Sequence, residues 1–220
     1  VKMSKSLGNV VNPDDVVKAY GADTMRLYIM FIGDFEKVAT WSDDAVKGCK
    51  RFLDRVWNLA DQVTEEKGVS EKNAPIVHKT IKKVTDDIDT LKMNTAIAAL
   101  MSMVNEFYAN GLSRGDLEAL LLMLSPFAPH MVEELWEQKG FAAEHDGKMA
   151  MQCDWPVYDE SKTVASSVEM AVQVGGKLKG TITVPVDSDQ DTVVEAAKAN
   201  EKVAKALAGM QIVKVIHVKN

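Results

Sequence analysis

Hydrophobic and polar positions follow a helical period from Trp41 onward. The first apolar stripe repeats at spacings of three and four residues, at Val46, Cys49, Leu53, Val56, Ala60 and Val63. Ser42, which precedes two acids, is a suitable N-cap for this helix. The polar face of the same helix carries four cations: Lys47, Lys50, Arg51 and Arg55. This face is either ordinary solvated surface or a strip that contacts phosphate groups.

Longer hydrophobic segments complete the helical region. One helix is predicted over residues 75–109, because apolar side chains there alternate spacings of four and three. The leucine-rich segment 117–124 is interrupted by Pro-Phe-Ala-Pro at 126–129, and a further helix follows this break. His130 is expected to be a hydrogen-bonded turn residue and not a base. Residues 41–158 are therefore predicted to form an antiparallel helical bundle.

The period changes after the bundle. Residues 159–167 are polar and predict a linker. The elements expected after it are a strand at 168–174, a hairpin turn at Gly175-Gly176, a strand at 177–184, a helix at 192–207 and a strand at 212–218. Residues 168–220 are thus predicted to form a small ββαβ domain. The expected fold class is mainly α with a small α+β domain.

Composition places the chain among ordinary soluble globular proteins. It has 220 residues and a formal net charge of −6, with 46% hydrophobic and 26% charged residues. No apolar run approaches the roughly 20 residues that a membrane span needs. No basic segment leads into an apolar stretch as in a secretion signal, so a cytoplasmic location is expected. Cys49, Cys153 and the four histidines are scattered, so neither a disulfide framework nor a metal site is predicted.

The strongest candidate chemistry lies in the sequence Lys2-Met3-Ser4-Lys5-Ser6, which Leu7-Gly8-Asn9 follows. Two ammonium groups and two hydroxyls on a glycine-terminated loop suit a polyphosphate, because compact cations on flexible stems can follow phosphates as they move. Gly8 also permits a backbone turn with positive φ. A solvated surface loop is the plain alternative for a Lys/Ser stretch, but a match to the whole pentapeptide is rare by chance.

These five residues resemble the second signature motif of class I aminoacyl-tRNA synthetases. That family makes an aminoacyl-adenylate from ATP, used with Mg²⁺, and then charges tRNA. The resemblance implies that the pentapeptide binds ATP. It also implies that Lys5 stabilises the charge that develops on the departing pyrophosphate, supported by Lys2. The catalytic candidates are therefore Lys5 and Lys2.

The next segment extends the resemblance. The sequence "NPDDVVKAYGADTMRLYIM" is similar to the stem-contact region of the leucine, isoleucine, valine and methionine branch, so residues 1–40 are assigned to the lysine loop and this region. Asn12 is expected to cap a short helix that stops at Gly21. Arg26, in the following helix, is either catalytic or a structural residue that ties its helix to the loop.

The remainder resembles the end of bacterial leucyl-tRNA synthetases. "SPFAPHMVEELW" is typical of their helical domain, and "MAVQVGGKLKGTITVPVD" looks like their small C-terminal domain, which docks on tRNA. The resemblance implies a C-terminal fragment of this family, a monomer whose full-length form uses ATP, leucine and leucine tRNA. No His-Ile-Gly-His-type sequence, nucleotide-binding core or editing domain is found. The chain by itself is therefore not expected to form the adenylate.

Basic residues supply the candidates for tRNA binding. They are Lys47, Arg51, Arg55, Lys177, Lys179, Lys198, Lys202 and Lys205. Lys177 and Lys179 are expected on one face of their strand, and the last three lysines on one face of the final helix. Solvated charge is the open alternative for all of them. The alternative functions are a free-standing RNA-binding module, a helical protein-interaction scaffold and another synthetase of the isoleucine, valine and methionine branch.

Overall fold

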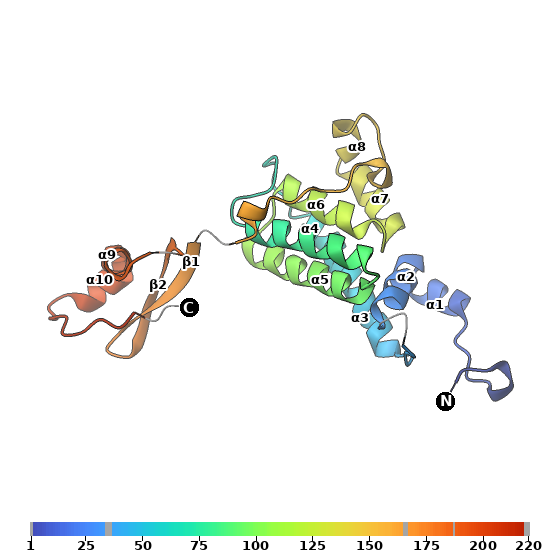
Figure 1. Ribbon diagram of the computed structural model, residues 1–220, viewed down its shortest axis with the longest axis horizontal. Coiled ribbons are helices and arrows are strands. Elements are labelled where there is room, and N and C mark those ends of the chain that lie inside the picture. Colours follow the sequence, from blue (N-terminus) through green and yellow to red (C-terminus); the bar gives the residue numbers. More distant parts are fainter. Residues whose placement is uncertain (1, 34–36, 165–166, 187, 218–220) are drawn as a thin grey trace. The chain divides into compact units, whose positions relative to one another are not determined.

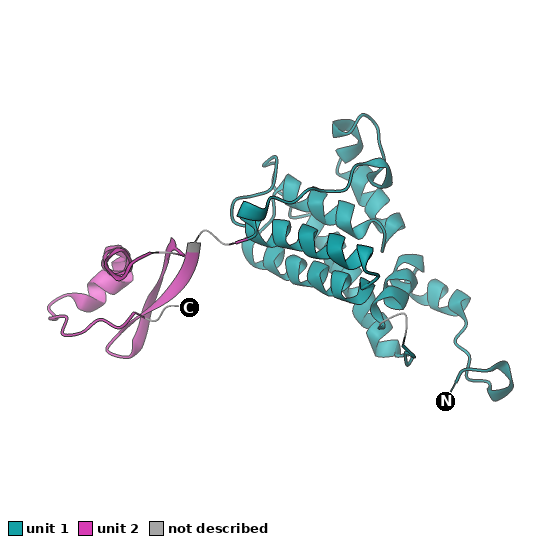
Figure 2. Cartoon of the chain, in the orientation of Figure 1, with its two compact units in different colours: residues 1–163 teal, residues 164–220 magenta. Residues whose placement is uncertain are grey.

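The computed structural model describes residues 2–33, 37–164, 167–186 and 188–217. The chain divides into two compact units, Val1–Thr163 and Val164–Asn220, which Figure 2 colours separately. Helices dominate, and a small antiparallel sheet lies in the second unit. The predicted fold class, mainly α with a small α+β domain, is confirmed.

The first unit is built from helices and short 3-10 turns (Figure 1). The helices are α1 (Pro13–Tyr20), α2 (Ala22–Phe31), α3 (Asp43–Ala60), α4 (Ala74–Asp89), α5 (Met93–Asn110), α6 (Arg114–Leu124), α7 (Pro129–Gln138) and α8 (Phe141–Glu144). The 3-10 turns are η1 (Lys5–Leu7), η2 (Ala150–Gln152) and η3 (Glu160–Lys162). Within the described ranges, no helix combines the length and the apolar composition that crossing a membrane requires.

The predicted helix ends around α1 and α3 are confirmed. Asn12 Oδ1 accepts the Asp14 N–H at 3.2 Å at the start of α1. Gly21 ends this helix with a φ of 90°, and α2 begins at the next residue. Ser42 Oγ accepts the Ala45 N–H at 3.3 Å at the start of α3. These side chains satisfy amides that a helix leaves without a partner in its first turn.

The single helix predicted over residues 75–109 is wrong, because the structure divides it into α4 and α5. The chain reverses at Leu91, whose φ is 58°, and the two helices lie side by side (Figure 1). Buried Asp87 holds the turn: its carbonyl accepts the Lys92 N–H at 2.7 Å, and its carboxylate accepts the Thr95 hydroxyl at 2.7 Å. No glycine or proline marks the reversal, so the apolar spacing concealed it.

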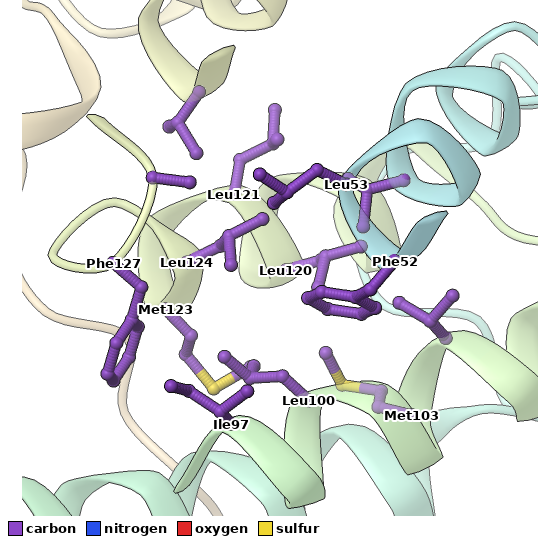
Figure 3. Packing of buried hydrophobic residues seen from close by; sticks show 14 of the residues in the cluster. Phe52, Leu53, Ile97, Leu100, Met103, Leu120, Leu121, Met123, Leu124 and Phe127 are labelled. Atoms are coloured by element: carbon purple, nitrogen blue, oxygen red, sulfur yellow. The ribbon is translucent and has the colours of Figure 1, made fainter. Parts of the chain in front are cut away.

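Side chains of α3, α5 and α6 form the centre of the core in the first unit (Figure 3). The labelled contacts comprise Phe52 and Leu53 from α3, Ile97, Leu100 and Met103 from α5, and Leu120, Leu121, Met123 and Leu124 from α6. The predicted break after α6 is confirmed, and Phe127 in that break is fully buried. Methionine and leucine side chains fill much of the space between these helices.

A buried carboxylate fixes the long connection between α3 and α4. Asp116, at the start of α6, accepts four hydrogen bonds, from Ser70 N–H (3.1 Å), Ser70 Oγ (2.7 Å), Asn73 Nδ2 (2.8 Å) and Ser113 N–H (2.9 Å). The connection also lies against Gly115, where an added Cβ would stand 2.1 Å from the carbonyl carbon of Gly68. Only a glycine at this position lets the two backbones approach so closely.

Residues 159–162 lie along α4. The Asp159 N–H donates to His78 Nδ1 at 3.1 Å, and Glu160 pairs with Lys82 at 2.7 Å. This part of the segment predicted as a linker therefore packs on the bundle. Residues 165 and 166 of the same segment lie outside the described residues.

The second unit contains a hairpin of β1 (Ser167–Val174) and β2 (Lys177–Pro185). Gly175 and Gly176 connect the strands with φ values of 59° and 76°, as the two-glycine turn predicts. The register shifts at Lys179, which stands as an extra residue opposite β1.

The helix predicted over residues 192–207 is instead two helices, α9 (Gln190–Ala199) and α10 (Glu201–Leu207). Asn200 leaves the helical conformation between them. Its Oδ1 accepts the N–H groups of Lys202 and Val203, at 3.1 and 3.3 Å, and its Nδ2 donates to the Thr181 carbonyl of β2 at 3.2 Å. An asparagine side chain competes well for backbone groups, which is why the helix restarts here.

The strand predicted over residues 212–218 is not found in its described part. Residues 211–217 have no strand partner, and most of them are exposed. Residue 218 lies outside the described residues. A β-rich sequence gains little from the extended conformation unless its backbone groups pair with a neighbouring strand. The described order is therefore ββαα and not ββαβ.

Candidate functional site

The lysine motif folds into a small closed loop. The Ser4 N–H donates to Asn9 Oδ1 at 2.9 Å, and Asn9 Nδ2 lies 3.5 Å from the Lys2 carbonyl. The 3-10 turn η1 ends between these contacts at Gly8, whose φ is 62°. The hydroxyls of Ser4 and Ser6 are 3.1 Å apart. Asn9 therefore closes the loop, a role that the sequence interpretation missed although asparagine often bonds backbone groups in turns.

The two lysines of this loop offer free positive charge. Lys2 and Lys5 are exposed, and neither forms an ion pair with the part of the chain that the structure describes. A phosphate ligand would not have to displace an acidic partner from either ammonium group. The loop thus brings two cations and two hydroxyls to one short segment, which is suited to charge on a polyphosphate.

The helices that follow the loop are fastened to the bundle through Asp23 of α2. Its carboxylate accepts the Met131 N–H at 2.7 Å, contacts the His130 N–H at 3.4 Å and pairs with His130 Nδ1 at 2.8 Å. These amides are at the start of α7, so Asp23 caps that helix from more than a hundred residues away. His130 is hydrogen-bonded as predicted, but it lies in the first turn of α7 and not in the turn before that helix.

Arg26, one turn later in α2, supports the same attachment. Its guanidinium donates to the Pro126 carbonyl at 3.2 Å, in the turn between α6 and α7. The interpretation in which Arg26 ties its helix to the lysine loop is therefore wrong, because the side chain bonds to the bundle. The hydroxyl of Tyr28 adds a third contact by accepting the Ser42 N–H at 2.9 Å. α1 and α2 thus connect the loop to the bundle, and α2 supplies the three polar anchors.

The predicted basic strip on α3 is partly neutralised. Lys47 pairs with Asp44 at 3.4 Å, and Lys50 pairs with Asp54 one turn along the helix. Arg55 lies over the ring of Tyr108 of α5, with 4.7 Å between the guanidinium carbon and the ring centre. Arg51 is exposed and has no ion pair among the described residues. Exposed pairs of this kind are weak, so a phosphate can compete for their lysines.

The candidate lysines of the second unit are all exposed. The break at Asn200 places Lys198 in α9 and leaves Lys202 and Lys205 on α10, so the expectation of one continuous helix face is wrong. Lys179 is the extra residue at the register shift in β2. The regular alternation of side chains along a strand is interrupted there, so it does not place Lys177 and Lys179 on one face.

Cysteine thiols and metal-ligating side chains are two further kinds of candidate chemistry among the residues that the structure describes. Cys49 is buried, and burial raises the pKa of its thiol to about 11, so it stays a neutral thiol near pH 7. Across the described residues, no group of three histidine, cysteine or carboxylate side chains could hold a metal ion.

Comparison with known families adds to this geometry. Residues 76–196 match the model of the anticodon-binding domain of tRNA ligase, which is more than half of the chain. The chain belongs to this anticodon-binding domain family. Residues 1–42, which include the lysine loop and α2, match the model of class I tRNA synthetases for isoleucine, leucine, methionine and valine.

Individual relatives of the chain are leucine-tRNA ligases. The chain is 48% identical over 218 residues to a leucine-tRNA ligase of Alkaliphilus oremlandii and 45% identical over 224 residues to one of Chlorobaculum tepidum. Each alignment covers 99% of the chain and 27% of the relative, so the chain spans about a quarter of their length. The predicted resemblance to leucine-tRNA ligases is confirmed.

A solved structure is similar as well. It is a ternary complex of an Agrobacterium radiobacter LeuRS with tRNA and LeuAMS, with a TM-score of 0.66 and 30% sequence identity. The similarity covers 99% of the chain and 30% of that protein.

Proposed function

We propose that the chain is the C-terminal part of a leucine-tRNA ligase, which activates leucine with ATP and transfers it to tRNA. The observation that carries this proposal is the 48% identity to a leucine-tRNA ligase over 99% of the chain. In the proposed enzyme, Lys5 stabilises negative charge on the departing pyrophosphate and Lys2 assists it, with Mg²⁺ accompanying ATP. Asn9 and Gly8 hold the loop in the closed form seen here.

The two units supply the tRNA contacts in this proposal. The bundle offers Lys47, Arg51 and Arg55 on α3, and the second unit offers exposed lysines on β2, α9 and α10. Anticodon recognition is not part of the proposal, because a helical bundle by itself does not define which part of a tRNA it contacts. Asp23 and Arg26 connect this RNA-binding surface to the lysine loop through α2.

The catalytic role is tested in the full-length enzyme with Lys5→Ala. We expect the rate of ATP-pyrophosphate exchange to fall by about 100-fold, since one lost donor to transition-state charge typically costs that much. Leucine binding should change little, because the ammonium group acts on the phosphates. Lys18→Ala, an exposed lysine on α1, is the matched control. A parallel loss of leucine binding would show misfolding and reject the assignment.

The RNA role is tested on this chain with leucine tRNA over a range of salt concentrations. Changing Lys198, Lys202 and Lys205 to alanine should reduce the slope of log affinity against log salt by about one for each lysine that meets a phosphate. Lys92→Ala, at the turn between α4 and α5, is the control and should leave the slope unchanged. A salt-independent interaction would favour a protein-interaction scaffold instead.

A further inference from the structure

A cleft of about 510 Å³ opens where the α1–α2 junction faces α3 and the start of α7. Its lining includes Tyr20 from α1, Asp23 from α2, His130 from α7, and Lys50, Asp54 and Trp57 from α3. The volume falls in the range of about 300–1,000 Å³ that is usual for sites of small organic groups. The cleft is separate from the lysine loop, which lies ahead of α1.

The aromatic groups of the cleft have unused polar atoms. Three tryptophans donate their indole N–H within the unit: Trp41 to Asp43 (2.8 Å), Trp136 to the Lys148 carbonyl (3.0 Å) and Trp155 to Thr85 (2.8 Å). The indole of Trp57 has no such acceptor among residues that the structure describes, and the same holds for the hydroxyl of Tyr20. Both side chains line the cleft and are half-buried, and each combines an aromatic ring with a polar atom.

The charged groups around these rings are arranged by helical spacing. Lys50, Asp54 and Trp57 stand at positions i, i+4 and i+7 of α3, and therefore lie on one face of that helix. Lys50 provides a cation, Asp54 a hydrogen-bond acceptor and Trp57 an aromatic ring. The carboxylate of Asp23 is engaged by hydrogen bonds from the start of α7 and from His130. Arg51, next to Lys50, is an exposed cation beside this face.

We propose that the cleft receives one unpaired nucleotide of a bound RNA, with the base against Trp57 and Tyr20. Proteins recognise unstacked bases by stacking on aromatic side chains and by hydrogen bonds to the base edge, while nearby cations hold the backbone. Trp57 Nε1, the Tyr20 hydroxyl and the Lys50–Asp54 pair supply the donors and the acceptor for such an edge. Arg51 and Lys47 extend the cationic surface toward the adjoining phosphates. The inference rests on the proposed RNA-binding function and assigns one nucleotide-binding position within it.

The experiment measures affinities of this chain for two RNA probes at one salt concentration. The probes are a leucine tRNA transcript, which has unpaired nucleotides, and a blunt RNA duplex without them. Trp57→Ala should weaken tRNA binding by about tenfold or more, as expected for the loss of one stacked base. The affinity of the Trp57→Ala variant for the duplex should equal that of the unmodified chain. Trp57→Phe keeps a stacking ring and should restore most of the affinity for tRNA.

A control and a direct signal accompany these affinities. Tyr158→Ala removes an exposed aromatic ring next to Lys82, away from the cleft, and should alter neither probe's affinity. Saturating tRNA should quench part of the tryptophan fluorescence, and Trp57→Phe should abolish that part.

The outcomes separate the two proposals. Salt-dependent tRNA binding that Trp57→Ala leaves intact would overturn the nucleotide position while the RNA role stands. An equal loss for tRNA and duplex with Trp57→Ala would also overturn it, because the ring would then support the fold and not a base. A chain that binds neither RNA would reject both proposals.

Discussion

The two units of the chain differ in how much apolar surface they bury. The first unit buries a continuous apolar core that draws side chains from α1 through α8. In the described part of the second unit, the buried apolar side chains are Ile182, Val184 and Val203. Since buried apolar area is the main source of folding free energy, the second unit has far less reserve. Its hairpin and its two short helices depend on a few side chains and on the Asn200 bridge to β2.

This difference parallels the placement of charge. The bundle pairs most of the cations on α3 with acids or with an aromatic ring, whereas the lysines in the described part of the second unit are exposed. A small unit with a limited core and free cations can present charge to RNA without many internal contacts. The larger unit instead provides fixed geometry, as in the attachment of α2 to α7 through Asp23.

The largest effect is expected in the first unit from Asp116→Ala. This change removes the acceptor of four hydrogen bonds. The buried Ser113 N–H and the partly buried donors of Ser70 lose that acceptor, while Asn73 Nδ2 keeps the Gly111 carbonyl at 2.9 Å. We expect the free energy of unfolding to fall by about 4 kcal/mol, because each unsatisfied buried group costs about 1–3 kcal/mol. Urea denaturation followed by circular dichroism measures this loss.

Asp61→Ala is the control for the removal of a carboxylate. Asp61 pairs with Lys139 at 2.8 Å but is mostly exposed, so the expected loss is below about 1 kcal/mol. Similar losses for the two variants would contradict the assignment of Asp116 as the residue that holds the α3–α4 connection.

The next effect compares one core substitution in each unit. Ile182→Ala and Leu120→Ala each remove a buried side chain, at a typical cost of about 2–4 kcal/mol. In Leu120→Ala, the first unit should remain folded, and its amides should still exchange slowly. The second unit should open, so that amides of residues 167–207 lose protection in Ile182→Ala while those of the bundle keep it. Hydrogen exchange with mass spectrometry resolves the two regions, and retained protection in the second unit would show a larger core than the one described here.

The same contrast explains what the sequence could predict of the fold. Helices with a capping residue and an apolar stripe, such as α1 and α3, were predicted with their starts, because cap and period agree. The α4–α5 reversal was not predicted, because a hydrogen bond between Thr95 and Asp87 stabilises it and no glycine or proline marks it in the sequence. In the second unit, the hairpin followed from two glycines, but Asn200 divides the helix by reaching β2, a contact outside any local pattern.

The candidate site shows a similar division. The proposed phosphate chemistry of Lys2 and Lys5 is a prediction from residue types and spacing, since ammonium groups and a glycine form a local pattern. The roles of three other residues were not predicted, because each depends on a partner seen only in the folded chain. Asn9 bonds to Ser4, Asp23 to the start of α7, and Arg26 to the Pro126 carbonyl. Local motifs thus predicted the candidate groups, whereas the contacts of Asp23 and Arg26 with residues about a hundred positions away required the structure.

The smallest expected effect concerns the end of the first unit and depends on pH. Burial lowers the pKa of His78 below its ordinary value near 6.5, and the positive charge of Lys162 lowers it further, while Asp159 opposes the shift. Because the unfolded chain then binds this proton more readily, the contribution of His78 to stability is complete above pH 6.5. It is lost as the pH falls through the lowered pKa of the folded state.

Protonation also removes Nδ1 as the acceptor for the Asp159 N–H, so residues 159–162 should loosen from α4 in acid. The cost should be about 1 kcal/mol or less, the usual net value of one hydrogen bond. NMR titration of the His78 ring and the Asp159 amide measures both events, with His78→Gln as the variant that does not titrate. A ring that gains its proton above pH 6.5 would contradict the direction, and an Asp159 amide that does not follow the ring would contradict the contact.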